Sequence, residues 1–140
     1  MILYLHGFTS GPQSVKARAL GERMAARGLA ADFICPQLPA SPAAAMALAE
    51  QIIEQHRKLG AGETVAYGKN GAQITLVGSS LGGFYATVLA EKYDLNAVLV
   101  NPAVINQLPM DDFIGTHQWL YTGEPFEFTA QHIFVIREGN

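Results

Sequence analysis

A short apolar run that leads straight into a glycine-rich turn is the feature that most limits what this chain can fold into. Residues 74–77, Ile74-Thr75-Leu76-Val77, form a largely apolar run, and Gly78-Ser79-Ser80-Leu81-Gly82 follows at once. A helical pattern then extends from about residue 81 to residue 93. Continuous apolar runs of this length are typical of strands buried on both faces. The segment is therefore predicted to form a buried strand, a tight turn and a helix.

The same alternation recurs along most of the chain. We expect strands at 2–5, 33–35, 74–77 and 97–100, and helices at about 14–27, 42–59 and 81–93. Ser14 and Ser41-Pro42 are favourable helix starts, and Gly28 and Gly60 are favourable helix ends. After Pro109 the pattern weakens, and we expect only a helical turn at 111–114 and strands at 126–128 and 133–136. The alternation predicts an α/β fold, a three-layer and mostly parallel sheet, in a single domain over 1–140.

Composition removes several classes of function. The chain has 140 residues, a formal charge of −3 and a pI near 5.7, so it has no excess positive charge for a nucleic acid. No apolar run approaches the roughly 18 residues that span a bilayer, and residues 1–5 are too short for a signal peptide. Cys35 is the one cysteine, which excludes an internal disulfide and a cysteine-based metal cluster. We therefore expect a cytoplasmic protein with no nucleic-acid or membrane partner.

The segment Gly78-Ser79-Ser80-Leu81-Gly82 matches the pattern G-x-S-x-G. In a nucleophile elbow a strand enters such a turn and a helix leaves it, which lifts the serine hydroxyl above the sheet edge. The turn is tight enough that the positions of Gly78 and Gly82 must lack side chains. A glycine-rich turn that binds phosphate or only packs closely is the alternative. The strand–turn–helix context favours Ser80 as a catalytic nucleophile.

The triplet His6-Gly7-Phe8 directly follows the first predicted strand. Acyl transfer needs two N–H donors aimed at one oxygen, and the N–H groups of Leu81 and Phe8 stand where these donors are expected. His6 at the strand end suits a structural role in holding this loop, and we do not expect it to be the catalytic base. Aromatic residues later in the chain are expected to be core rather than substrate wall, and the alternative is that part of their segment covers the acyl pocket: Trp119, Tyr121, Phe126 and Phe128.

Taken together, these residues resemble the small YqiA-like bacterial esterases of the α/β-hydrolase superfamily. The resemblance rests on the segments 3–8, 36–39, 76–83, 100–104, 121–123 and 131–133. It implies an α/β-hydrolase-like fold and a hydrolase of small acyl esters or thioesters that needs no cofactor or metal. It further implies that Ser80 is the nucleophile, and that Phe8 and Leu81 supply the oxyanion hole. His6, Gly7, Gly78 and Gly82 would support this site.

The acid and the base of such a site have no clear counterpart in this chain. An α/β-hydrolase supplies them after the serine, in the order acid and then histidine. His117 and His132 follow Ser80, and the candidate acids are Asp111, Asp112 and Glu124. Order alone does not establish contact geometry. Residues 135–140 resemble the segment before the family's catalytic histidine, so we expect the C-terminal strands to be reduced or missing. Loss of the acid and the base with them would impair ester hydrolysis at Ser80.

A second interpretation follows from that expectation. A hydrolase fold without its last strands would expose a parallel-sheet edge, and exposed edges pair readily with another chain. The chain would then be a non-catalytic remnant that self-associates or binds a partner. Ester hydrolysis that depends on Ser80 separates the two interpretations, and both allow a homo-oligomer.

Overall fold

The computed structural model describes residues 1–60, 74–103 and 114–129, and its centre is a four-stranded parallel sheet. The strands are β1 (Ile2–Leu5), β2 (Phe33–Ile34), β3 (Thr75–Ser79) and β4 (Asn96–Val100), in the order β2-β1-β3-β4. Every pairing in this sheet is parallel. Since parallel neighbours need crossover connections, each strand is followed by a helix or a long connection before its partner. The predicted α/β fold with a mostly parallel sheet is confirmed.

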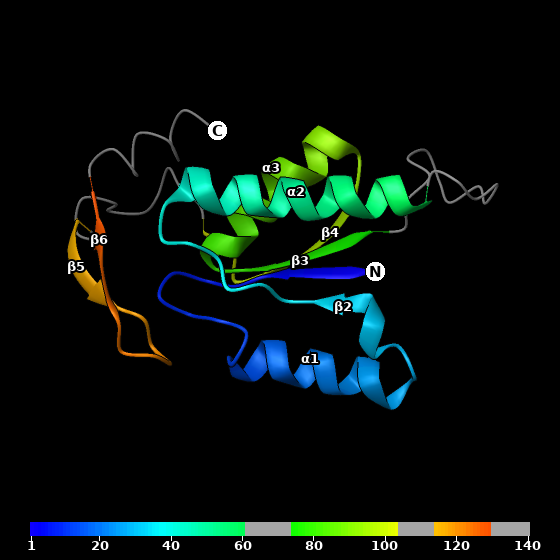
Figure 1. Ribbon diagram of the computed structural model, residues 1–140, viewed down its shortest axis with the longest axis horizontal. Coiled ribbons are helices and arrows are strands. Elements are labelled where there is room, and N and C mark those ends of the chain that lie inside the picture. Colours follow the sequence, from blue (N-terminus) through cyan, green and yellow to red (C-terminus); the bar gives the residue numbers. More distant parts are fainter. Residues whose placement is uncertain (61–73, 104–113, 130–140) are drawn as a thin grey trace.

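Helices cover both faces of the sheet, as Figure 1 shows. Helix α1 (Val15–Ala26) lies on one face, whereas α2 (Pro42–Gly60) and α3 (Leu81–Tyr93) lie on the other. A short 3₁₀ helix, η1 (Ala30–Asp32), leads into β2. This arrangement gives the three layers that the alternation of strands and helices predicted.

The helix ends are set by the residues that the sequence indicated. The Ser14 hydroxyl accepts a hydrogen bond from the Ala17 N–H at 3.3 Å and caps α1. Gly28 follows that helix with φ 74°, a left-handed conformation that costs glycine little. Asp94 ends α3 in the same region, with φ 52°.

The core lies between the sheet and the pair α2 and α3. Its largest fully buried side chains include Leu3 and Leu5 of β1, Leu76 of β3 and Leu89 of α3. Helix α2 contributes a line of residues spaced by four, Ala45, Ala49 and Ile53, all fully buried. A smaller cluster on the opposite face contains Tyr4, Ala17 and Val77. The two central strands are therefore buried on both faces, as continuous apolar runs predict.

A two-stranded antiparallel hairpin lies beyond the carboxyl ends of β1 and β3 (Figure 1). It consists of β5 (Gly115–Gln118) and β6 (Pro125–Phe128). The sequence predicted β6 but missed β5, because Gly115-Thr116-His117-Gln118 has no apolar alternation. The expected helical turn at 111–114 and the expected strand at 133–136 lie outside the described residues, apart from Ile114, which is neither helix nor strand.

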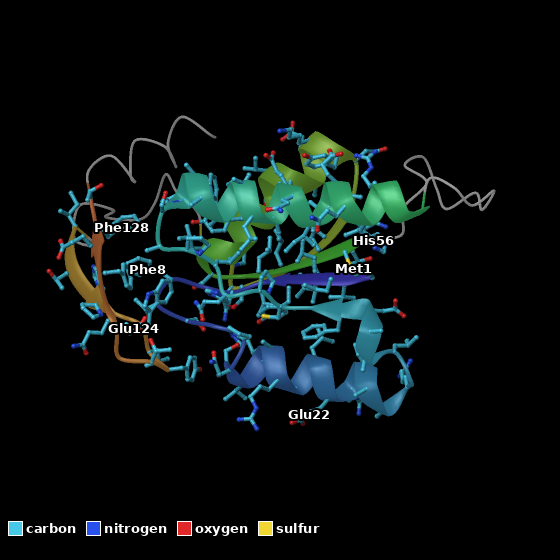
Figure 2. The ribbon with its side chains drawn as sticks, in the orientation of Figure 1. Met1, Phe8, Glu22, His56, Glu124 and Phe128 are labelled. Atoms are coloured by element: carbon cyan, nitrogen blue, oxygen red, sulfur yellow. The ribbon has the colours of Figure 1, made fainter. Side chains whose placement is uncertain are left out.

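The hairpin is joined to the body of the fold through aromatic rings. Phe128 is fully buried, and its ring centroid lies 5.1 Å from that of Phe8 (Figure 2). The Phe8 ring also meets the rings of Phe126 and His117 edge-on. Tyr121 was expected to be a core residue, but it is 43% exposed. It lies at the tip of the hairpin, so that prediction is wrong.

No helix in the described ranges is both long enough and apolar enough to cross a membrane.

Candidate functional site

Ser80 occupies a tight turn between the end of β3 and the start of α3. Its backbone has φ 57° and ψ −119°, a combination that L residues rarely adopt, and the residue is exposed. Such a conformation costs on the order of 1–3 kcal/mol and persists only where the surroundings hold it. Hydrogen bonds fix this backbone conformation. The Ser80 N–H donates to the Val100 carbonyl at 3.1 Å. Its own carbonyl accepts from the Gly83 and Ala103 N–H groups at 3.0 and 2.8 Å.

The two glycines of the pentapeptide are where the turn has no room for side chains. A Cβ atom on Gly82 would collide with the Leu5 carbonyl oxygen. A Cβ atom on Gly78 would collide with the Gly82 carbonyl. Helix α3 therefore starts in direct contact with the ends of β1 and β3. This close approach is the physical reason for glycine at both positions.

The loop after β1 lies against Ser80. Leu5 and Gly78 are register partners in the sheet, so β1 and β3 end side by side. A Cβ built on Gly7 would be 3.0 Å from the Ser80 Cβ and 3.6 Å from its Oγ. The two glycine-containing segments that the sequence singled out, 6–8 and 78–82, are thus brought together. Gly7 lets the backbone of its loop approach the serine side chain closely.

His6 is a buried residue with both ring nitrogens engaged. Its Nε2 accepts the Leu38 N–H at 2.8 Å, and its Nδ1 lies 2.8 Å from the Gly7 carbonyl oxygen. An Nε2 that accepts leaves the proton on Nδ1, so the ring is neutral and donates to Gly7. Burial lowers the pKa of His6 below its usual value. These bonds tie the loop after β1 to the segment after β2, and they occupy the atoms that a base would need.

Two main-chain N–H groups, those of Leu81 and Phe8, come from the two segments that meet at Ser80. Leu81 is the first residue of α3, where N–H groups have no acceptor within the helix and where the positive end of the helix dipole lies. Phe8 follows Gly7, whose Cα faces the serine. The N–H groups of Leu81 and Phe8 thus belong to the two segments that meet at the hydroxyl.

A cavity of about 280 Å³ opens beside Ser80. Its wall is formed by the loop after β1, the first residues of α1 and the end of β3. The volume falls just below the range of roughly 300–1,000 Å³ that is usual for small-molecule sites. A small ligand could therefore reach the serine.

Of the residues proposed from the sequence as acid and base, the two that the structure describes, His117 and Glu124, do not line this cavity. Among the described residues that line it, His6 is the sole histidine and none carries a carboxylate. His117 stacks on Phe126, with 5.7 Å between ring centroids, and Glu124 is exposed in the connection between β5 and β6. Asp111, Asp112 and His132 lie outside the described residues.

The hairpin contact with the loop after β1 was not foreseen from the sequence. The Leu120 N–H donates to the Thr9 carbonyl at 2.8 Å, and Trp119 meets the His6 ring edge-on. Thr9 itself has φ 62°, so this loop is strained as well as buttressed. The aromatic residues at 119–128 indicated that this segment packs against another part of the fold. They did not indicate that the loop after β1 is the segment it contacts. In the described part of the chain, no group of three His, Cys, Asp or Glu side chains could hold a metal ion.

Comparison with known proteins agrees with this architecture. A solved structure from Agrobacterium vitis S4, provisionally named a hydrolase, superposes with a TM-score of 0.60 at 17% sequence identity. The alignment covers 99% of this chain and 60% of that chain, so the protein spans less than two thirds of the length of that relative. The model of an uncharacterised protein family, UPF0227, matches residues 1–138. The chain therefore belongs to UPF0227, in agreement with the YqiA-like resemblance of its motifs.

Proposed function

We propose that the protein is a serine hydrolase that cleaves small carboxylic esters or thioesters through an acyl-enzyme at Ser80. The observation that carries the proposal is the backbone conformation of Ser80. This residue is exposed between β3 and α3, with φ 57° and ψ −119°. A surface serine with no special task would not need a backbone strained by about 1–3 kcal/mol. The provisional name of the Agrobacterium vitis relative is in accord with hydrolysis.

The proposed reaction has two halves. In the first, Ser80 Oγ attacks the carbonyl carbon of the substrate, and the tetrahedral oxyanion accepts hydrogen bonds from the Leu81 and Phe8 N–H groups. Collapse breaks the bond to the leaving alcohol or thiol, which departs with the proton that the Ser80 hydroxyl gave up on attack. In the second, water attacks the acyl carbon, which releases the carboxylate and restores the hydroxyl. Removal of one such oxyanion donor typically costs about 10²–10³ in kcat.

The supporting residues act through geometry. Gly78 and Gly82 let α3 begin close enough to the sheet for the Leu81 N–H to face the hydroxyl. His6 and Gly7 fix the loop that carries Phe8. Both ring nitrogens of His6 are engaged in hydrogen bonds, so the proton of Ser80 passes to another group. The histidines that follow the serine in the chain are His117 and His132.

A fluorophosphonate probe tests the proposal, because it reacts covalently only with an activated serine. We expect labelling of the wild type on the peptide that contains Ser80, and complete loss of label in Ser80→Ala. Ser79→Ala is the matched control, since it removes the adjacent hydroxyl and leaves the proposed nucleophile. Label at Ser79, or label that survives in Ser80→Ala, would contradict the proposal. Burst release of p-nitrophenol from p-nitrophenyl butyrate should follow the same pattern.

A second candidate function, self-association through the sheet edge, is supported by the exposure of β4. Val98 is 53% exposed and Leu99 is 42% exposed, although both belong to a parallel strand. Strands with exposed apolar edges pair readily with another chain. Sedimentation velocity at micromolar concentration tests this function. A dimer that dissociates in Val98→Lys supports it, whereas a monomeric wild type excludes it.

A further inference from the structure

We infer that the substrate of the Ser80 cavity carries a negatively charged group, which Lys16 binds. This inference rests on the proposed function and extends it to the substrate class. The ligand group is an anionic oxygen group, either a carboxylate or a phosphate, attached to the acyl chain or to the leaving group.

Lys16 and Ser80 line the same cavity although they are 64 residues apart in sequence. Lys16 reaches it from the first turn of α1, the helix that covers the opposite face of the sheet from α3. The cavity that they share has a volume of about 280 Å³. A ligand that fills the cavity would therefore contact both Ser80 and Lys16, since both line it.

The charge of the lining is one-sided. Lys16 is its one cation, and no carboxylate is present among the described residues of the wall. In the described part of the chain the salt bridge joins Lys92 to Glu50 on α3 and α2, and Lys16 has no ion pair. The whole chain has a formal charge of −3, so this wall has the opposite sign of charge from the chain as a whole. An anion in the cavity would supply the counter-charge.

Hydroxyl groups of the wall can complete the anion site. Ser10 and Ser14 line the cavity together with Lys16. The Ser14 oxygen accepts the Ala17 N–H, which leaves its own proton free to be donated. Hydroxyl and ammonium donors together are the usual partners of carboxylate and phosphate oxygens.

The other cations of α1 provide the contrast. Arg18 and Arg23 are exposed on the same helix, as Lys16 is, but neither of them lines the cavity. A lysine that only solvates the helix surface would behave like these arginines when substituted. A lysine that binds substrate would behave differently, and only toward charged substrates.

Two esters that differ in one terminal group provide the test. In p-nitrophenyl hexanoate the six-carbon acyl chain ends in a methyl group, and in mono-p-nitrophenyl adipate it ends in a carboxylate. We expect Lys16→Gln to lower kcat/KM for the adipate ester by about tenfold, the loss typical of one hydrogen bond to a charged group. The hexanoate ester should change by less than about twofold on the same scale. Arg18→Gln is the control and should leave the ratio of the two rates unchanged, while Lys16→Arg should retain part of the preference.

A binding measurement keeps this inference separate from the proposed chemistry. Monomethyl adipate, butyl phosphate and neutral methyl hexanoate are each titrated into Ser80→Ala by calorimetry. Binding of either anion to Ser80→Ala that is lost in the double variant Ser80→Ala/Lys16→Gln supports the inference. The anion that binds more tightly identifies the charged group. Equal affinity for all three ligands, or anion binding that survives Lys16→Gln, overturns it. Absence of Ser80 labelling with anion binding intact would overturn the proposed function alone.

Discussion

Strands β3 and β4 are paired neighbours in the sheet, yet they have opposite surroundings. They pair in parallel over five residues, from Thr75 with Asn96 to Ser79 with Val100. The three central residues of β3 are buried, whereas the first four residues of β4 are exposed. Val77 and Val98 are register partners, with exposed fractions of 7% and 53%. An apolar run thus indicates a strand, but the elements packed against that strand decide what the run contributes to stability.

The turns that follow these two strands also differ in their surroundings. The turn after β3 is enclosed by β1 and α3, and the site residues crowd there. The turn after β4 begins with Asn101, which also has a positive φ, 45°, but is exposed. Substitutions that test this difference should range from loss of folding on the β3 side to small effects on the β4 side.

The largest effect is expected for Gly82→Ala. The added methyl group meets the Leu5 carbonyl, which belongs to the rigid centre of the sheet and cannot move aside. We expect a loss of more than about 4 kcal/mol in the free energy of unfolding, enough to unfold a marginally stable domain. Asn101→Ala is the comparison after β4 and should cost only about 1 kcal/mol for its left-handed backbone. Urea titration followed by circular dichroism measures both, and a folded Gly82→Ala with native stability would contradict the close packing.

An intermediate effect is expected for the register pair itself. Val77→Ala removes two methyl groups from a buried site and should cost about 2 kcal/mol, including the cavity that remains. Val98→Ala removes the same groups from an exposed site and should cost less than about 0.5 kcal/mol. The two variants are matched in residue type, strand direction and register. Equal costs in urea titration would mean that β4 is covered in solution, for example by a second copy of the chain.

The smallest effect is expected from pH. Burial lowers the pKa of His6 in the folded chain, while the unfolded chain retains a value near the ordinary ~6.5. Below that pH the unfolded state takes up a proton that the folded state does not, so stability is full above it and falls as the pH drops. We therefore expect the free energy of unfolding to decrease between pH 7 and pH 5. Residues 96–100 of β4 carry no ionisable side chain, so the edge strand adds nothing to this dependence.

His6→Gln separates this contribution from the other histidines. Glutamine can still accept the Leu38 N–H but does not titrate, so the decrease should become smaller. His56 is the control, since its pKa is also lowered, first by burial, and His56→Gln should leave the His6 contribution intact. An unchanged pH dependence in His6→Gln would contradict a neutral, buried ring.

Much of the sheet and its helices could be predicted because local signals agreed there. The observed bounds of β1 and α3 coincide with those expected, and β2 and β4 differ from expectation by one residue at one end. Strand β3 begins one residue later and continues two residues further than expected, because Gly78 and Ser79 still pair with β4. Capping residues and apolar runs act within a few positions, so they can be read from the sequence.

The part that could not be predicted depends on contacts between distant segments. Nothing in Gly115-Thr116-His117-Gln118 indicates a strand, since it is stabilised by pairing with β6 rather than by its own pattern. Two motifs predicted that residues 6–8 lie close to residues 78–82. The hydrogen bond that the Leu38 N–H donates to the His6 ring was not predicted. The position of Lys16 beside the Ser80 cavity could not be predicted either, because the sequence does not show which side of α1 faces a cavity.

The main-chain hydrogen bonds of Ser80 couple the two halves of the comparison. Its N–H is held by Val100, the last residue of β4, and its carbonyl by Ala103 just beyond. Displacement of the outer strand would therefore pull on the backbone that sets the direction of the hydroxyl. By thermodynamic linkage, a molecule that docks on that strand and shifts Val100 must alter ligand affinity at the serine, and a ligand at the serine must alter docking by the same factor.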